Sequence, residues 1–268
     1  MMDTNQLEQL CSKVCALAKE TGAFIKEEQK KISPKEIEIK GLNNFVTYVD
    51  KEAERRIITK LSEFIGDAGY IAEEGTQTKK GDIYNWIIDP LDGTTNFIHG
   101  CPPFAISIAL MEHNEIILGV VYEINLDECF YAWKDGPAML NNSKISVSGN
   151  SSMDKAFIVT GFPYTAYDRI DGFMESMRYF FQKSAGVRRL GSAATDLAYV
   201  ACGRFDAFYE YGLNAWDVAA GILIIQQAGG KIHDFKGGKD YIFGAEIVAT
   251  NAAIHEDFRI KVAEFLSK

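Results

Sequence analysis

The segment Ile87-Ile88-Asp89-Pro90-Leu91-Asp92-Gly93-Thr94-Thr95 joins an apolar run to two acids and a turn of small residues. The apolar run Tyr84 to Ile88 predicts a buried strand, so Asp89 and Asp92 follow its carboxyl end. A helix that begins at Gly93 would point free backbone N–H groups at the same place, where an anion can bind. The alternative is structural, with Asp89 opening a turn and Asp92 capping the helix.

Acidic residues also stand at the ends of two other predicted elements. Glu73 and Glu74 follow the short apolar run Tyr70-Ile71-Ala72, and Asp217 follows Trp216 at the start of an apolar helix. Taken alone, Asp217 is a helix cap. Clustered carboxylates repel one another unless a cation neutralises them, and hard cations prefer oxygen ligands. Together these acids predict a metal site assembled from segments that are distant in the sequence.

The N-terminal part of the chain predicts two helices separated by a hairpin. Apolar residues at helical spacing predict a first helix that runs to about Glu28. Residues 37–39 and 45–49 predict the two strands of the hairpin. Asp50 is then expected at the N-cap of a second helix, which ends at Gly66.

The length and composition fit a single domain with a large core, because the chain has 268 residues and 47% of them are apolar. Three strand-like runs from Phe104 to Trp133 predict an antiparallel meander. Helical and strand segments alternate beyond Ala166. The segment Ser146 to Asp154 is rich in Ser, Gly and Asn, and it predicts a boundary between two lobes, about 1–150 and 151–268. The alternative is that this segment is only a surface loop.

Several classes of function are disfavoured by composition. The net charge is -9 and Lys/Arg runs do not exceed a pair or two, so we expect no direct nucleic-acid binding. The first residues lack the apolar core of a signal peptide, and the apolar runs are shorter than a membrane helix. We therefore expect a cytoplasmic protein. The five cysteines form no C-x-x-C pair, and their odd number favours free thiols.

Other catalytic motifs are absent from the sequence. It contains no G-x-x-x-x-G-K-[ST], H-E-x-x-H or G-x-S-x-G run, and the two acids of the opening segment are one residue too far apart for a D-x-D nucleophile. Its four histidines lack zinc-site spacing and are interpreted as structural or surface residues.

Three blocks of the sequence together resemble the inositol monophosphatase family of lithium-sensitive, Mg²⁺-dependent phosphatases. They are Ala72-Glu73-Glu74-Gly75, then Trp86 to Phe97, and Trp216-Asp217-Val218-Ala219-Ala220-Gly221. The stretches Arg189 to Ala194 and Glu210-Tyr211-Gly212 are similar to the substrate region of that family. The resemblance covers most of the chain and implies an αβαβα sandwich with large antiparallel and mixed sheets, of the inositol monophosphatase and sugar phosphatase type.

The resemblance also implies two or three Mg²⁺ ions in each active site. Glu73, Asp89 and the carbonyl of Leu91 would hold the activating metal, and Asp89, Asp92 and Asp217 would hold a second. A two-metal site activates water at neutral pH and stabilises the attacking and leaving oxygens of an in-line displacement.

The remaining roles implied by the resemblance concern water, phosphate and alcohol. Thr94, paired with Asp50, would orient and deprotonate the attacking water, and Glu73 would assist. The backbone N–H groups of Gly93, Thr94 and Thr95 would bind the phosphoryl oxygens. The expected alcohol-binding residues are Asp92, Gly191, Ala193, Glu210 and Asp217. For Glu210 the alternative is a surface acid at the end of a strand.

The substrate implied by the resemblance is inositol 1-phosphate or a similar polyol phosphate. Alternatives that need the same machinery are fructose 1,6-bisphosphate, adenosine 3′,5′-bisphosphate, NADP(H) and histidinol phosphate. A different class of function is a regulatory binding protein without catalysis, which is disfavoured because every expected metal ligand is present. Members of the family are usually homodimers, so we expect a homodimer here.

Overall fold

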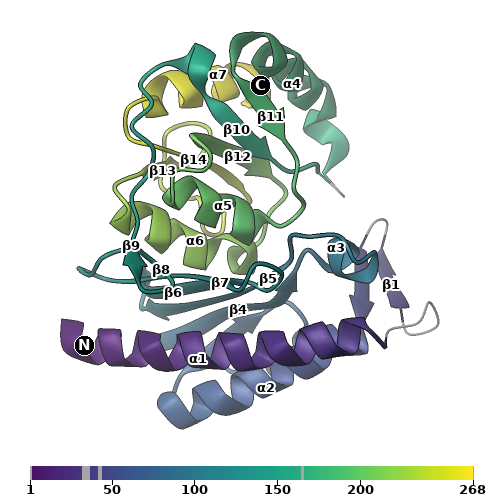
Figure 1. Ribbon diagram of the computed structural model, residues 1–268, viewed down its shortest axis with the longest axis vertical. Helices are drawn as coiled ribbons and strands as arrows, with labels where there is room; N and C mark the ends of the chain where they lie inside the picture. Colours follow the sequence, from purple (N-terminus) through teal and green to yellow (C-terminus); the bar gives the residue numbers. More distant parts are fainter. Residues whose placement is uncertain (1, 32–36, 42–43, 164–165, 268) are drawn as a thin grey trace.

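The computed structural model of the protein describes residues 2–31, 37–41, 44–163 and 166–267, and the side chains of 37–41 and 44–46 are outside that description. Five layers alternate between helices and sheets (Figure 1). Helices α1 (Thr4–Gln29) and α2 (Tyr48–Phe64) form one outer layer. The predicted αβαβα sandwich is confirmed.

The larger sheet has seven strands in sequence order, β3 to β9. Only the first pair, β3 and β4, is parallel, and the others are antiparallel, which confirms the predicted meander. The strands are β3 (Gly69–Ala72), β4 (Tyr84–Asp92), β5 (Ala105–Glu112), β6 (Glu115–Glu123), β7 (Glu128–Trp133), β8 (Met139–Leu140) and β9 (Ser143–Lys144).

The smaller sheet has five strands in the order β11-β10-β12-β14-β13 and mixes parallel with antiparallel pairs. Its strands are β10 (Phe157–Thr160), β11 (Gly186–Arg188), β12 (Ala207–Tyr211), β13 (Lys231–His233) and β14 (Glu246–Thr250). A further hairpin, β1 (Ile37–Gly41) with β2 (Asn44–Thr47), lies beside the layers. Its predicted turn includes residues 42 and 43, which lie outside the described residues.

Apolar side chains fill the spaces between successive layers. The helices α5 (Ala193–Ala201) and α6 (Ala215–Gln227) lie between the two sheets and are almost wholly buried. The outer face of the larger sheet packs against α1 and α2. The outer face of the smaller sheet packs against α4 (Ile170–Lys183) and α7 (His255–Leu266). The helices that carry the candidate site are therefore held on both sides by sheets.

The start of α2 differs from the sequence prediction. The second hairpin strand ends at Thr47 instead of residue 49, and Thr47 is the N-cap, while Asp50 is the third residue of the helix. Thr47 and Asp50 form a capping box, in which each side chain accepts from the other's backbone N–H. The β-branched residues before Asp50 favour a strand, and this local preference concealed the cap.

Strand β4 continues past the predicted end at Ile88 as far as Asp92. Asp89 pairs with Ser107 and Asp92 with Ala105, so β4 has one extra residue between these pairs. Such a bulge accommodates Pro90, which has no N–H for the ladder, and it redirects the side chains on either side. The bulge is what places two acids of one strand at the same site.

The C-terminal half follows the predicted alternation, with two omissions. Strands β10 and β13 were not predicted, although Phe157–Thr160 is a β-branched and aromatic run. The predicted boundary segment, residues 146–154, joins the last strand of the larger sheet to the first strand of the smaller one. Whether the lobes divide there stays a prediction.

Candidate active site

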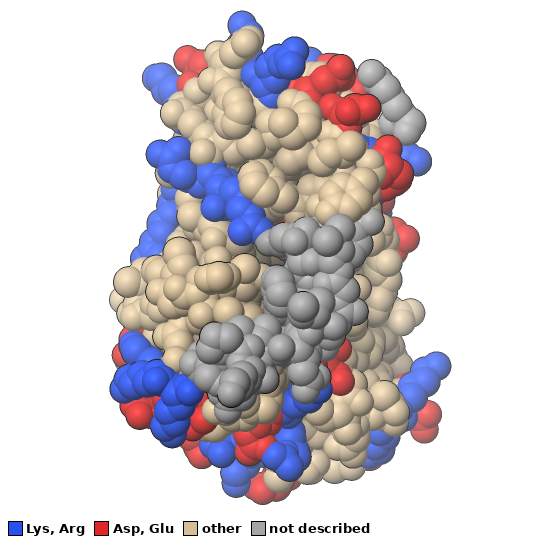
Figure 2. All heavy atoms as spheres, turned by 90° about the vertical axis from the view of Figure 1, so that its right-hand side faces the viewer, with Lys and Arg blue, Asp and Glu red and all other residues tan. Residues whose placement is uncertain are grey.

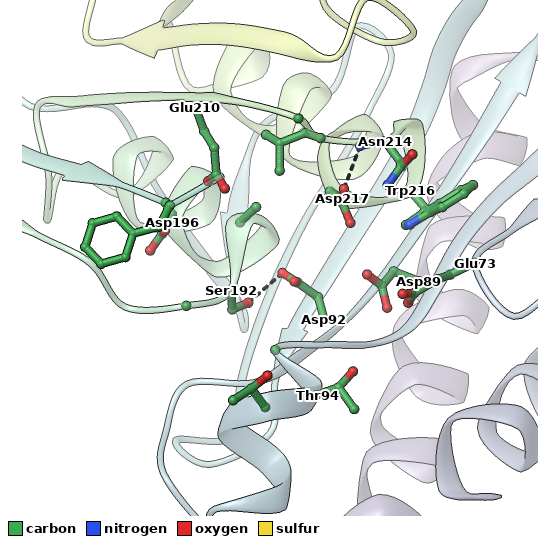
Figure 3. Close-up of a pocket in the computed structure, with 18 of the residues that line it drawn as sticks. Glu73, Asp89, Asp92, Thr94, Ser192, Asp196, Glu210, Asn214, Trp216 and Asp217 are labelled. Carbon is green, nitrogen blue, oxygen red and sulfur yellow. Dashed lines mark hydrogen bonds between the residues drawn. The ribbon is translucent and has the colours of Figure 1, made fainter. Parts of the chain in front are cut away.

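A cavity of about 210 Å³ opens where the end of β4 meets the first residues of α3 (Thr94–Ile98), α5 and α6. The end of β12 contributes Glu210 and Tyr211 to its wall. Figure 3 shows carboxylates from these elements directed into one space. Segments separated by more than a hundred residues therefore meet at this cavity, as the spacing of the acids predicted.

Three aspartates form the centre of the cavity. Asp89, Asp92 and Asp217 each offer an oxygen, and these oxygens lie within 4.8 Å of one another. Each carboxylate is oriented by the backbone: Asp89 accepts from Leu91 N (2.9 Å), Asp92 from Ala194 N (2.7 Å), and Asp217 from Asn214 N (2.7 Å). One oxygen of each aspartate is thereby fixed by a backbone N–H group.

The electrostatics of this cluster favour a bound cation. Burial, together with the charges of Glu73, Asp92 and Asp217, raises the pKa of Asp89 well above its ordinary value. Burial also raises the pKa of Asp92 to about 6, although hydrogen bonds from Ser192 and Ala194 oppose that rise. The pKa of Asp217 rises to about 7 because of burial and the charge of Asp92. Oxygen donors that repel one another in this way fit a hard divalent cation.

Glu73 and Leu91 line the same cavity. Glu73 lies just after β3, and Glu54 of α2 holds the loop that follows it. The buried Glu54 carboxylate accepts from Glu74 N (2.7 Å), Thr76 N (2.7 Å) and the Thr76 hydroxyl (2.7 Å). Glu54 was not singled out in the sequence, because a single acid on a helix gives no sign that it fixes a distant loop.

Thr94 connects the cavity to Asp50. Its hydroxyl lies 3.1 Å from Asp50 Oδ1 and 3.1 Å from Leu91 O, so a single proton has two possible acceptors. Thr94 lines the cavity, whereas Asp50 is fully buried and is joined to the cavity by its hydrogen bond with Thr94. Burial raises the pKa of Asp50, and hydrogen bonds from Thr47 oppose the rise. The structure thus brings the predicted Thr94–Asp50 pair together.

Gly93, Thr94 and Thr95 form the floor of the cavity at the start of α3. Gly93 has φ +92°, and a Cβ at this position would lie 3.1 Å from Pro103 O and 3.2 Å from Gly191 O. A larger residue would be both strained and crowded there. The turn therefore requires glycine, and it brings the backbone of residues 93–95 close to the acids.

The predicted alcohol-binding residues Gly191, Ala193 and Glu210 all line the cavity. Glu210 is buried at the end region of β12, so the alternative of a surface acid is wrong. Gly161 and Asp196 also line the cavity and were not predicted as site residues. A Cβ at Gly161 would lie 2.0 Å from Glu210 Oε1, so this glycine leaves the room that the Glu210 carboxylate occupies.

Comparison with known proteins agrees with this geometry. The profile of the inositol monophosphatase family matches residues 6–267. The chain belongs to the inositol monophosphatase family. The inositol-1-monophosphatase of Mesorhizobium japonicum is 39% identical over 238 residues, which cover 88% of this chain and 90% of that protein. The Nus factor SuhB of Pseudomonas aeruginosa is 39% identical and covers 87% of this chain and 88% of that protein.

A solved inositol monophosphatase (IMPase) structure from Thermotoga maritima superimposes with a TM-score of 0.88 at 34% identity, covering 97% of this chain and 98% of that one. As a member of this family, the protein is a phosphoric monoester hydrolase, and the family is generally metal-dependent. In the described part of the chain, no helix has both the length and the apolar character to cross a membrane.

Proposed function

We propose that this protein hydrolyses inositol 1-phosphate to myo-inositol and phosphate with Mg²⁺ as cofactor. The observation that supports the proposal most is the cluster of Asp89, Asp92 and Asp217 in one cavity with Thr94 and the turn at Gly93. Carboxylates that hold cations beside backbone amides that face an anion suit the transfer of a phosphoryl group to water.

In this proposal the metal ligands are those expected from the family resemblance. Glu73, Asp89 and the Leu91 carbonyl hold one ion, and Asp89, Asp92 and Asp217 hold another. The donor set fits Mg²⁺ because all the ligands are oxygens and because oxygens of the three aspartates lie within 4.8 Å of one another. Bound Mg²⁺ lowers the pKa of water and offsets the negative charge of the phosphoryl oxygens.

The protein's own groups then position the reactants. Thr94 Oγ1, held by Asp50 Oδ1, accepts a hydrogen bond from the attacking water and passes its proton toward Asp50. The raised pKa of the buried Asp50 suits a group that receives a proton. Glu73, which lines the same cavity, assists. The N–H groups of Gly93, Thr94 and Thr95 donate to the phosphoryl oxygens, where negative charge develops.

The proposed alcohol end consists of Asp92, Gly191, Ala193, Glu210 and Asp217. Acidic side chains on this side of the cavity suit the hydroxyls of a polyol, which donate hydrogen bonds to them.

Release of inorganic phosphate, measured with and without Mg²⁺, tests the proposal. We expect wild-type protein to release phosphate from inositol 1-phosphate only with Mg²⁺, and Asp92→Asn to lose at least about a hundredfold in rate. The proposal fails if wild type releases no more phosphate than Asp92→Asn. Hydrolysis of adenosine 3′,5′-bisphosphate or fructose 1,6-bisphosphate without hydrolysis of inositol 1-phosphate would overturn the proposed substrate and leave the phosphatase activity in place.

We also propose inhibition by Li⁺, a homodimer, no direct nucleic-acid binding and a cytoplasmic location. Inhibition in the range of about tens of millimolar Li⁺ follows from the competition of a small cation for oxygen ligands. On the face seen in Figure 2, Lys and Arg side chains lie in several separate groups, and those in its lower part are interspersed with Asp and Glu. Light scattering on the purified protein measures the oligomeric state, and a gel-shift titration measures nucleic-acid binding.

A further inference from the structure

Asp196, on α5, is a buried acid in the cavity that has no role in the proposed reaction. Its side chain is 1% exposed, and its Oδ1 has no hydrogen-bond partner among the described residues. A buried carboxylate oxygen without a partner is costly, and such atoms are rare in folded proteins. The cavity is the side from which a partner can reach it, because Asp196 forms part of the cavity wall.

Asp206 shows how a structural acid of similar burial is treated in the same half of the chain. It is 7% exposed, and its two oxygens accept from the hydroxyl of Ser148, the side chain of Asn251 and Phe157 N. Every oxygen of Asp206 is therefore used within the fold. The contrast indicates that Asp196 is kept for a group that comes from outside the protein.

The position of Asp196 indicates what that group is. Figure 3 places Asp196 and Glu210 together on the side of the cavity away from Glu73 and Asp89. Glu210 is close enough for its charge to act on Asp196, and no hydrogen bond to the Glu210 carboxylate is present among the described residues. Two buried carboxylates thus face the region that receives the alcohol part of the substrate.

The chemistry of this wall selects its ligand. A carboxylate accepts hydrogen bonds when it is ionised and also donates one when it is protonated, and a polyol hydroxyl, which both donates and accepts, pairs with either form. A flat apolar base or a simple alkyl group would leave both carboxylates unsatisfied, at a cost that discriminates strongly against it.

We infer that Asp196 is a specificity-determining residue which, with Glu210, accepts hydrogen bonds from two hydroxyls of the substrate's alcohol part. The inference rests on the proposed phosphatase function and narrows its substrate class to alcohols with at least two hydroxyls besides the ester oxygen. Gly161 contributes by leaving space for Glu210.

The test compares kcat and KM for inositol 1-phosphate, its deoxy analogues and phenyl phosphate, whose leaving group has no further hydroxyl. We expect Asp196→Ala to lower the preference for inositol 1-phosphate over phenyl phosphate, as a ratio of kcat/KM, by at least about tenfold. The loss should lie mainly in KM, since the contact is made before and during the reaction. For wild type, one deoxy analogue should have a lower kcat/KM than inositol 1-phosphate. For Asp196→Ala, the same analogue and inositol 1-phosphate should have equal kcat/KM values.

Two further variants separate binding from folding. Asp196→Asn keeps an oxygen acceptor and cannot become charged, so we expect a smaller loss of preference and a Tm no lower than that of wild type. If Asp196→Ala does not fold, Asp196→Asn is tested with the deoxy analogues instead. Its ratio of kcat/KM for inositol 1-phosphate to kcat/KM for the deoxy analogue should be lower than that of wild type. Asp154→Asn, an exposed acid outside the cavity, is the charge-matched control and should keep the wild-type ratio.

The outcomes distinguish this inference from the function on which it rests. If wild type hydrolyses none of the esters with Mg²⁺, the proposed function fails. Suppose that wild type hydrolyses inositol 1-phosphate, but the Asp196 variants keep the wild-type preference for inositol 1-phosphate over phenyl phosphate, or lose activity on these two esters equally. The role of Asp196 is then refuted, and the phosphatase function stands.

Discussion

The hydroxyl of Thr94 donates to Oδ1 of Asp50 across 3.1 Å, although the two residues are 44 positions apart in the sequence. The other oxygen of Asp50 accepts from the backbone N–H of Thr47 (2.9 Å) and from its hydroxyl (2.6 Å). One carboxylate therefore fixes the start of α2 and, through its second oxygen, the side chain that faces the cavity. The fold and the proposed reaction depend on the same group.

Replacing Thr94 by Val should lower kcat by about a hundredfold or more, because the attacking water loses its acceptor and the path of its proton. Thr94→Ser retains the hydroxyl and is the matched control, for which we expect kcat within a few-fold of wild type. Steady-state kinetics at saturating Mg²⁺ measure both. Equal kcat values for the Val and Ser variants would exclude a proton role for this hydroxyl.

Asp50→Asn tests the same pathway from its buried end. If Asp50 acts through Thr94, the double variant Thr94→Val/Asp50→Asn should be no slower than the slower single variant, since both changes remove one function. Independent losses that multiply in the double variant would contradict the pathway.

Glu54 offers a prediction about how Glu73, a proposed metal ligand, is positioned. The Glu54 carboxylate accepts hydrogen bonds from two backbone N–H groups, and Glu54→Gln places an amide NH₂, itself a donor, against one of them. The free energy of unfolding should therefore fall by about 1–3 kcal/mol. The concentration of Mg²⁺ needed for half-maximal activity should also rise, because the loop after β3 is released. Denaturant unfolding and a Mg²⁺ titration of activity measure the two effects.

Glu63→Gln is the control for that experiment, since Glu63 lies on the same helix and pairs with Lys60, and both side chains are about half exposed. Exposed ion pairs contribute little, and we expect a change below about 1 kcal/mol and no change in the Mg²⁺ requirement. If Glu54→Gln lowers stability and leaves the Mg²⁺ requirement as in wild type, Glu54 supports the fold without positioning Glu73.

The sequence predicted the residues of the cavity better than the contacts that hold them. Asp89, Asp92 and Asp217 were recognisable because acids at the ends of apolar elements are unusual and because the family motifs surround them. The bulge at Pro90 was not predictable, because it depends on the register of β4 against β5. Local rules likewise favoured Asp50 as a cap and missed the capping box with Thr47.

Gly161 and Asp196 were missed for a different reason. A glycine in a loop and an acid in an apolar helix have no pattern of their own, and their meaning depends on Glu210, which lies on another strand. Such residues can be found only when the distance between elements is known.

Gly161→Ala should raise KM for inositol 1-phosphate by about tenfold, because the added methyl group displaces the Glu210 carboxylate and removes one hydrogen bond to a charged acceptor. Gly149→Ala is the control, since a Cβ there meets nothing within 4 Å. An unchanged KM for Gly161→Ala would show that Glu210 can move without loss of binding.

The last prediction concerns acid stability and the pair His233 and His255. His255 is 2% exposed, and its Nε2 lies 2.7 Å from His233 Nδ1. Its Nδ1 lies 2.9 Å from the Thr250 hydroxyl, which itself donates to Asn251 O. The hydroxyl therefore accepts from His255, and His255 Nε2 must accept from His233, which requires a neutral His255.

Burial, together with the charge of His233, lowers the pKa of His255 from 6.5 to about 4. As pH falls from 6.5 to 4, the unfolded chain binds a proton at this residue and the folded chain does not, so the free energy of unfolding decreases. In His255→Asn this part of the pH dependence should disappear. The free energy of unfolding should then change less steeply with pH between 4 and 6.5 than it does in wild type. Denaturant unfolding at several pH values measures the slopes. His113→Asn, at an exposed turn with φ +53°, should keep the wild-type slope, and an equally steep slope in His255→Asn would contradict the assignment.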